Sequence, residues 1–159
     1  MAIQTYVSAV TVDVLTGQPL IILKGVNDDR LIPIRVGAAE ARSIDRAYRR
    51  SRFATADAHD VLLKFIKEVH GDVMAVALEE MEEGGMIAYF RVRTDGKAIV
   101  IDCRPSDAIA IAVKTGNPIW LSASAIGVES KLSDDDESER DKFRSFVSDL
   151  KPSDFKLDR

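Results

Sequence analysis

The strongest constraint on the fold is an internal repeat. A shift of 67 positions places Gly17 on Gly84 without a gap and aligns five further pairs of similar residues. Those pairs are Leu20 and Ile87, Ile34 and Ile101, Glu40 and Asp107, Ala41 and Ala108, and Ile44 and Ile111. Because the matches share one register and similar turns, they favour duplication over coincidence. We therefore predict two halves that fold alike.

Each half reads as three short strands followed by a helix. Aliphatic and β-branched runs between turn residues predict the strands, and helical spacing predicts the helices. The first half has strands at 7–15, 20–24 and 31–36 and a helix at 38–50, and the second has strands at 73–81, 86–93 and 98–103 and a helix at 105–114. The predicted fold class is α+β, with duplicated βββα units and a mostly antiparallel or mixed sheet.

Three further elements complete the prediction. A connecting helix joins the halves, with Thr55 or Asp57 as its N-terminal cap and Gly71 at its end. Residues 118–121 predict a short strand. A C-terminal amphipathic helix is predicted because apolar residues recur at helical spacing at Phe143, Phe146, Val147 and Leu150.

The charge pattern suggests where the main domain ends. Residues 129–142 hold seven acidic and three basic side chains, which is typical of a solvated linker. We therefore predict one domain over residues 1–125, followed by an acidic linker and helical tail over residues 126–159.

Composition excludes several classes of protein. A hydrophobic content of 46% excludes a disordered chain, and no apolar run approaches the ~20 residues that cross a bilayer. The net charge of −4 argues against a general nucleic-acid coat protein. The first residues lack the pattern of a signal peptide, and a single cysteine, Cys103, fits a reducing compartment. We expect a cytoplasmic protein without a membrane segment.

The helix at 105–114 also bears on assembly. It is apolar on almost every side, so it needs cover from several directions. Part of that cover can come from a second copy of the chain, and we therefore expect a homo-oligomer, a dimer or higher.

Acidic residues at the two repeat helices are the first candidates for chemistry. Asp102, Arg104 and Asp107 lie where a strand meets the helix at 105–114, and Glu40 is the repeat partner of Asp107. In one interpretation they are helix-capping and dipole-stabilising groups. In the other, the carboxylates of Asp102 and Asp107 are acid ligands, with Arg104 beside them for a phosphate and Glu40 facing the same cleft.

A histidine and a set of arginines are the remaining candidates. His59 and Asp60 lie near the start of the connecting helix, where His59 is either a boundary residue of the core or a general base or metal ligand. Arg42, Arg46 and Arg49 fall on one helical face, which is either a solvated surface or a phosphate-binding track.

Two stretches carry a family resemblance. LIPIRVGAAEA at 31–41 and IDCRPSDAIA at 101–110 resemble the hallmark stretches of the bifunctional nuclease domain family, and the resemblance extends over residues 7–121. Members usually carry an Arg-Pro-x-Thr-His-Asp run before the middle helix. Here RFATADA at 52–58 precedes His59 and Asp60, without the proline.

The resemblance implies a nuclease that hydrolyses phosphodiester bonds of RNA or DNA, assisted by a divalent cation such as Mg²⁺. Combined with the candidate residues, it gives catalytic roles to Glu40, His59, Asp60 and Asp107, phosphate binding to Arg42, Arg46, Arg49 and Arg104, and metal binding to Glu40, Asp102 and Asp107. The competing hypothesis is a non-catalytic, homo-oligomeric binding or regulatory module. In that hypothesis the acids are caps, and the arginines pair across a subunit interface.

Overall fold

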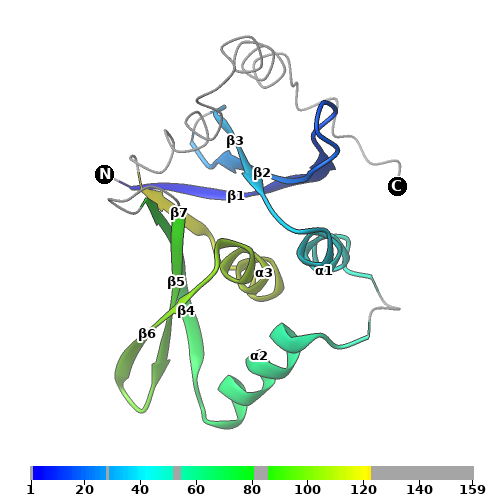
Figure 1. The fold of residues 1–159 in the computed structure, drawn as a ribbon. Helices are drawn as coiled ribbons and strands as arrows, with labels where there is room; N and C mark the ends of the chain where they lie inside the picture. The colour runs from blue at the N-terminus through cyan, green and yellow to red at the C-terminus, as the bar shows by residue number, and fades with distance from the viewer. Residues whose placement is uncertain (1, 28, 52–54, 81–85, 123–159) are drawn as a thin grey trace.

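A computed structural model describes residues 2–27, 29–51, 55–80 and 86–122, and these residues form seven strands and three helices (Figure 1). In chain order they are β1 (Ala2–Val12), β2 (Pro19–Gly25), β3 (Leu31–Arg35), α1 (Ala38–Tyr48), α2 (Ala58–Glu68), β4 (Asp72–Glu80), β5 (Met86–Thr94), β6 (Lys97–Cys103), α3 (Pro105–Thr115) and β7 (Ile119–Ser122). The α+β fold class is confirmed.

The strands form one mixed sheet in the order β3-β2-β1-β7-β4-β5-β6. Each half contributes an antiparallel meander, and β7 joins the two by pairing antiparallel with β1 and parallel with β4. The first strand of each meander has an irregular register, between Val7 and Ala9 in β1 and between Val73 and Ala75 in β4. The two halves therefore lie on opposite sides of one short central strand.

The predicted elements agree with the observed ones to within two residues at their described ends, except for the first strand, which was predicted at 7–15 and lies at Ala2–Val12. The order βββα occurs in both halves, with α2 between them, while duplication as the origin of that order stays a prediction. The predicted C-terminal helix and acidic linker lie outside the described residues. The division into 1–125 and 126–159 is likewise a prediction.

The core lies between the sheet and the helices. Helix α3 is buried along most of its length, from Ala108 to Ala112, and it contacts α1, α2, β4 and β5. The helix thus finds cover within its own chain, because Ile44 of α1 and Phe90 of β5 belong to the same apolar cluster. Its apolar surface no longer calls for a second subunit. Among the described helices none is both long and apolar enough to cross a bilayer.

Candidate functional site

The repeat places two acidic residues at equivalent positions in two helices. Gly37 precedes α1 and Arg104 precedes α3 in the same extended backbone conformation, and neither helix start has a side-chain cap. Glu40 and Asp107 are each the third residue of their helix. An acid in the first turn is stabilised by the positive end of the helix dipole. The dipole alone therefore explains why both positions are acidic.

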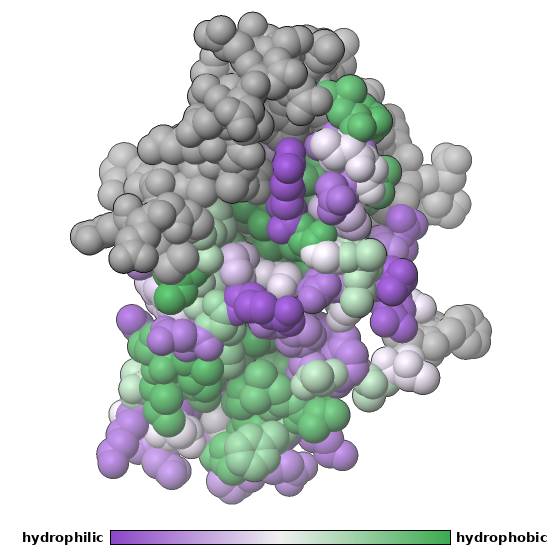
Figure 2. Space-filling view, in the orientation of Figure 1, coloured by the Kyte–Doolittle hydropathy of each residue, from purple (hydrophilic) through white to green (hydrophobic). Residues whose placement is uncertain are grey.

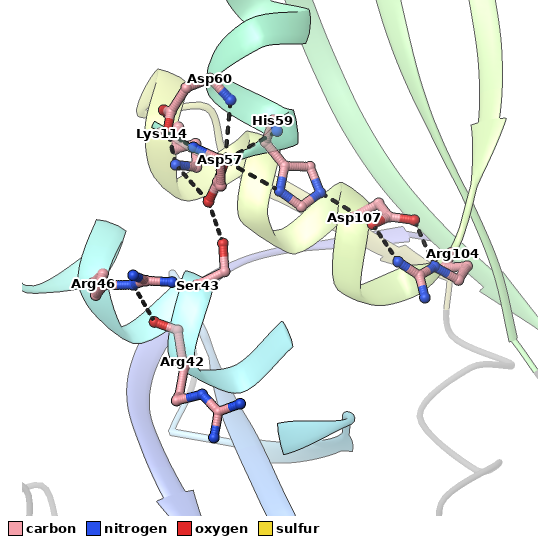
Figure 3. A network of polar contacts seen from close by, with 9 residues as sticks. All are labelled: Arg42, Ser43, Arg46, Asp57, His59, Asp60, Arg104, Asp107 and Lys114. Atoms are coloured by element: carbon pink, nitrogen blue, oxygen red, sulfur yellow. Dashed lines mark hydrogen bonds and ion pairs between the residues drawn. The ribbon is translucent and has the colours of Figure 1, made fainter. Parts of the chain in front are cut away.

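Arg104 joins the two acids across the halves. Its Nε and Nη2 atoms donate to the two carboxylate oxygens of Asp107 at 2.8 and 2.9 Å, and Nη1 donates to Glu40 Oε1 at 3.0 Å (Figure 3 shows the pair with Asp107). A planar guanidinium fits a carboxylate in this two-point manner. The Arg104 side chain is 65% exposed, so one face of the bridge is open to solvent.

His59 approaches Asp107 from α2. Its Nε2 lies 3.0 Å from Asp107 Oδ1, and its Nδ1 lies 3.7 Å from Asp57 Oδ1. Arg104, followed by His59, holds the pKa of Asp107 below its ordinary value despite partial burial of the carboxyl. An ionised Asp107 only accepts, so Nε2 carries the hydrogen. Among the described side chains, His59 Nδ1 is a buried atom without a hydrogen-bond partner.

Asp57 is the predicted cap of α2, and the structure confirms it. Its Oδ1 accepts the backbone N–H of His59 and Asp60, while Asp60 Oδ2 accepts the N–H of Asp57, which completes a capping box. Ser43 donates to the other oxygen of Asp57, and Lys114 lies 3.2 Å from it. Burial raises the pKa of Asp57, but these hydrogen bonds and the Lys114 charge outweigh burial and lower it strongly.

Two members of this network were missed by sequence reasoning. Ser43 reaches Asp57 from the second turn of α1, and Lys114 Nζ lies 2.8 Å from Asp60 Oδ1 at the end of α3. One signal was available for Lys114: it follows Asp107 by seven residues, which places both on one side of a largely apolar helix. The network thus ties the start of α2 to both repeat helices (Figure 3).

The predicted residues divide into two groups. The structure brings together Glu40, Arg104, Asp107 and His59 in one chain of contacts. Asp60 joins it through Asp57, which contacts both His59 and Asp60. Asp102 is separate from that chain. Strand alternation places Asp102 on the sheet face opposite to Cys103, and Cys103 packs against the core.

The predicted arginine track lies beside the network. Arg42, Arg46 and Arg49 are exposed. Arg49 pairs with Asp45 at 2.7 Å, and Arg46 Nε donates to the backbone oxygen of Arg42 at 3.3 Å. In Figure 3 the Arg42 side chain points away from His59 and Asp57. The α1 residues that contact the network are Glu40 and Ser43, so the arginines are neighbours of the site.

The acids do not form a cation site in this arrangement. Within the described ranges, no group of three or more His, Cys, Asp or Glu side chains is placed to hold a metal ion. Glu40 and Asp107, two of the predicted ligands, face the guanidinium of Arg104, and Asp102 lies on the other face of the sheet. The present geometry therefore fits a bound guanidinium between two carboxylates.

Cys103 does not add a nucleophile to the site. Burial, together with the charges of Asp107 and Asp102, raises the pKa of its thiol to about 11. Because the thiolate is the reactive form, the residue is inert at neutral pH.

Comparison with known proteins identifies the family. Two proteins of Mycobacterium tuberculosis, from strains CDC 1551 / Oshkosh and ATCC 25618 / H37Rv, are each 27% identical over 149 residues. Each match covers 87% of this chain and 89% of the relative, and both relatives are described as uncharacterized. The model of the bifunctional nuclease domain matches residues 21–132, which include α1, α2, α3 and every residue of the network. The chain therefore belongs to the bifunctional nuclease domain family.

Proposed function

We propose that the chain is a nuclease that hydrolyses phosphodiester bonds of RNA or DNA. The observation that carries the proposal is the contact chain Glu40–Arg104–Asp107–His59, which joins three helices and is open to solvent at Arg104. The family name supports the substrate class. A cytoplasmic location, which the single cysteine favours, is part of the proposal.

Arg104 is the proposed phosphate-binding residue. Its guanidinium is the exposed part of the network, and phosphate oxygens match its two-point geometry as carboxylate oxygens do. A phosphate that binds here competes with Glu40, whose single contact with Arg104 is weaker than the two-point contact of Asp107. Asp107 then keeps the guanidinium in place. Arg42, Arg46 and Arg49, on the exposed face of α1, are the proposed contacts for neighbouring phosphates of the nucleic-acid strand.

His59 is the proposed general base. Asp107 holds the hydrogen on Nε2, so the neutral ring has its lone pair on Nδ1. A buried acceptor without a partner costs free energy and calls for an explanation. A catalytic role explains the unpaired Nδ1, because a general base that takes a proton from water must have an unused acceptor. A small shift of the first turn of α2 is needed to admit the water.

The role of a divalent cation stays a prediction. The family resemblance implies Mg²⁺ dependence, and the cation would supply charge neutralisation and activate water. Because Glu40 and Asp107 face Arg104 in the structure, the roles given above to Arg104, Asp107 and His59 do not depend on an ion.

The test uses purified full-length protein on end-labelled single-stranded RNA and DNA, with Mg²⁺ and with a chelator. His59→Gln keeps an N–H close to the position of Nε2 but cannot transfer a proton, so we expect a fall in rate of about 10²-fold or more. His70→Asn is the matched control, because His70 is exposed at the other end of α2 and has the positive φ that Asn tolerates. Full activity in both His59→Gln and Asp107→Ala would reveal a contaminating nuclease.

A non-catalytic module is the second candidate function, and one observation favours it. Each acid of the network has a partner, and together they fasten α2 to α1 and α3 as a purely structural cluster does. In that case neither the wild type nor the two histidine variants cleave nucleic acid, and His59→Gln changes only the stability of the fold.

A further inference from the structure

Helix α2 is held on the fold unevenly along its length. Ile66, in its second half, is its one buried residue, and Leu62 packs against the core from a partly buried position. Val61 and Phe65 are exposed, and Figure 2 shows hydrophobic side chains over the lower part of the molecule, where Figure 1 draws α2. The first turn, Ala58–Asp60, has no buried apolar side chain. The polar contacts of this turn therefore fix its position.

Lys114 contacts both acids of the capping box at this turn. Its Nζ lies 2.8 Å from Asp60 Oδ1 and 3.2 Å from Asp57 Oδ2. The side chain of Lys114 is 13% exposed, so water screens these ion pairs less than it screens a surface pair. Without the ammonium, the two carboxylates would repel each other across the box. Lys114 thus holds the box closed.

His59 lies inside this box. Its backbone N–H donates to Asp57 Oδ1 at 3.0 Å, and the same oxygen accepts the N–H of Asp60 at 3.1 Å. A movement of the Asp57 carboxylate therefore moves the backbone of His59 and carries the imidazole ring with it. The placement of the ring depends on how firmly Asp57 is held.

Helix α3 holds the first turn of α2 at two points. Asp107, near the start of α3, contacts His59 Nε2, and Lys114, in its last turn, contacts the capping box (Figure 3). Seven residues separate the two, which places them on one side of α3 about 10 Å apart along its axis. The residues between them are buried from Ala108 to Ala112, so α3 is a fixed reference in the core.

We infer that Lys114 is a positioning residue for His59. It acts through Asp57 and Asp60, and it keeps Nε2 on Asp107, so that Nδ1 is the nitrogen without a hydrogen. The described contacts of Lys114 are with these two acids and not with the ring itself. The inference rests on the proposed function, in which His59 is the general base, because the placement of a base decides how well it reaches its proton donor.

The first test observes the ring and needs no cleavage. Nitrogen NMR of histidine-labelled, full-length protein shows which ring nitrogen carries the hydrogen, and about pH 9 is suitable because a free imidazole is neutral there. The chain has two histidines, so a His70→Asn variant assigns the His59 signals. In the wild type we expect the form with hydrogen on Nε2.

Lys114→Gln keeps a polar side chain near the two acids and removes the charge. We expect the ratio of the Nε2–H form to the Nδ1–H form of His59 to fall about tenfold, as the loss of one hydrogen bond to a charged group predicts. Lys114→Arg keeps the cation, and its ratio should stay within about twofold of the wild type. Lys67→Gln is the matched control: Lys67 is exposed in the last turn of α2, and its loss should leave the ratio unchanged.

A purely structural role for Lys114 gives a different result. In that case the folded Lys114→Gln protein keeps the wild-type ratio, and this result overturns the inference, as does an equal fall in Lys67→Gln. If Lys114→Gln does not fold, Ser43→Ala decides, because Ser43 donates to the Asp57 oxygen that Lys114 contacts. A lower ratio in Ser43→Ala supports the inference, and an unchanged ratio overturns it.

The second test separates kcat from KM on labelled single strands. Because Arg104 and the arginines of α1 are the proposed strand contacts, Lys114→Gln should lower kcat about tenfold and change KM about twofold or less. Lys114→Arg should restore kcat. If the wild type cleaves and Lys114→Gln has an unchanged kcat, the inference fails and the proposed function stands. If the wild type does not cleave, the proposed function fails, and the NMR ratio still decides whether Lys114 positions the ring.

Discussion

Glu40 and Asp107 have the same place in the two halves and different surroundings. Each is the third residue of its helix, yet Asp107 is held by Arg104 at two atoms and by His59, while Glu40 has one contact among the described side chains, with Arg104. The difference begins at the preceding cap position, which is Gly37 in one half and Arg104 in the other.

This comparison shows how a repeated backbone acquires a single site. The repeat supplies two equivalent helix starts that face each other, and one arginine makes them unequal because it reaches both acids. Helix α2, which lies between the two halves, adds His59 on the Asp107 side. In the proposed nuclease mechanism, the second half therefore supplies Arg104 and Asp107, and the first half contributes Glu40.

The largest expected effect comes from removing the better-held acid. Asp107→Asn loses the charge that orients both Arg104 and His59, so the rate of RNA or DNA cleavage should fall about 10²-fold or more. Glu40→Gln loses one solvent-exposed contact, and we expect a fall of about fivefold or less. Both rates are measured on labelled single strands. Equal losses would mean that the halves act as one symmetric unit.

The next effect concerns stability. Asp57→Ala removes the one side-chain cap among the three described helices and leaves Lys114 with only Asp60, so the free energy of unfolding should fall by about 2 kcal/mol. Asp57→Ser restores a capping oxygen and should recover part of the loss. The measurement is urea unfolding, with Asp45→Ala of the α1 surface as a control that changes little. A loss no larger than the control's would contradict the role of the cap.

The dependence of stability on pH allows Asp107 of the site to be compared with Asp13, an acid of the first half that lies outside the site. The pKa of Asp107 is lowered by Arg104 and His59, and that of Asp13 by the N–H groups of Leu15 and Thr16, which outweigh its burial. A lowered pKa in the folded state gives stability that is complete above about pH 4 and is lost as the pH falls through the folded value.

We therefore expect Asp107→Asn and Asp13→Asn each to flatten the dependence of unfolding free energy on pH below about pH 4. Chemical denaturation at pH 2 to 6 measures that slope. Only Asp107→Asn should also reduce cleavage, because the described contacts of Asp13 are with Arg35, Leu15 and Thr16, outside the network. An unchanged slope in Asp107→Asn would contradict its ionised, paired state.

The sequence predicts the parts of this site that depend on local order. Helical spacing and the repeat place Glu40 and Asp107 at equivalent helix starts, and the cap at Asp57 follows from its residue type. The same spacing correctly identifies an exposed arginine face on α1. The spacing does not predict whether the arginine face of α1 points toward the acids. The rotation of α1 about its axis is fixed by the packing of Ala41 and Ile44 in the core.

The contacts between distant segments could not be predicted in this way. Asp102 and Asp107 are close in sequence, but the strand's alternation sends Asp102 to the opposite sheet face. Lys114 meets Asp57 and Asp60 across more than fifty positions, and only the docking of α2 on α3 brings them together. Such contacts depend on how the elements pack, which no local pattern encodes.

The smallest expected effect comes from a substitution of Gly37, the residue at the N-cap of α1. Gly37 has a φ of −69°, which alanine adopts without strain, but an added Cβ would lie 2.3 Å from Glu40 Oε2. Gly37→Ala should therefore push the Glu40 carboxylate away and weaken its contact with Arg104, because that carboxylate is the end of a flexible side chain and can move. We expect cleavage to change by threefold or less, in the same direction as Glu40→Gln.

The double variant Gly37→Ala/Glu40→Gln gives the decisive comparison for this cap. If Gly37 acts only by leaving room for Glu40, the two changes are not additive, and the double variant cleaves at the rate of Glu40→Gln alone. Additive losses would show that the glycine serves the helix start independently of Glu40. The control is Ala39→Ser, which changes the first turn of α1 at a position with a normal backbone. Gly116→Ala would not serve as a control, because Gly116 has a φ of +72° and alanine there introduces backbone strain.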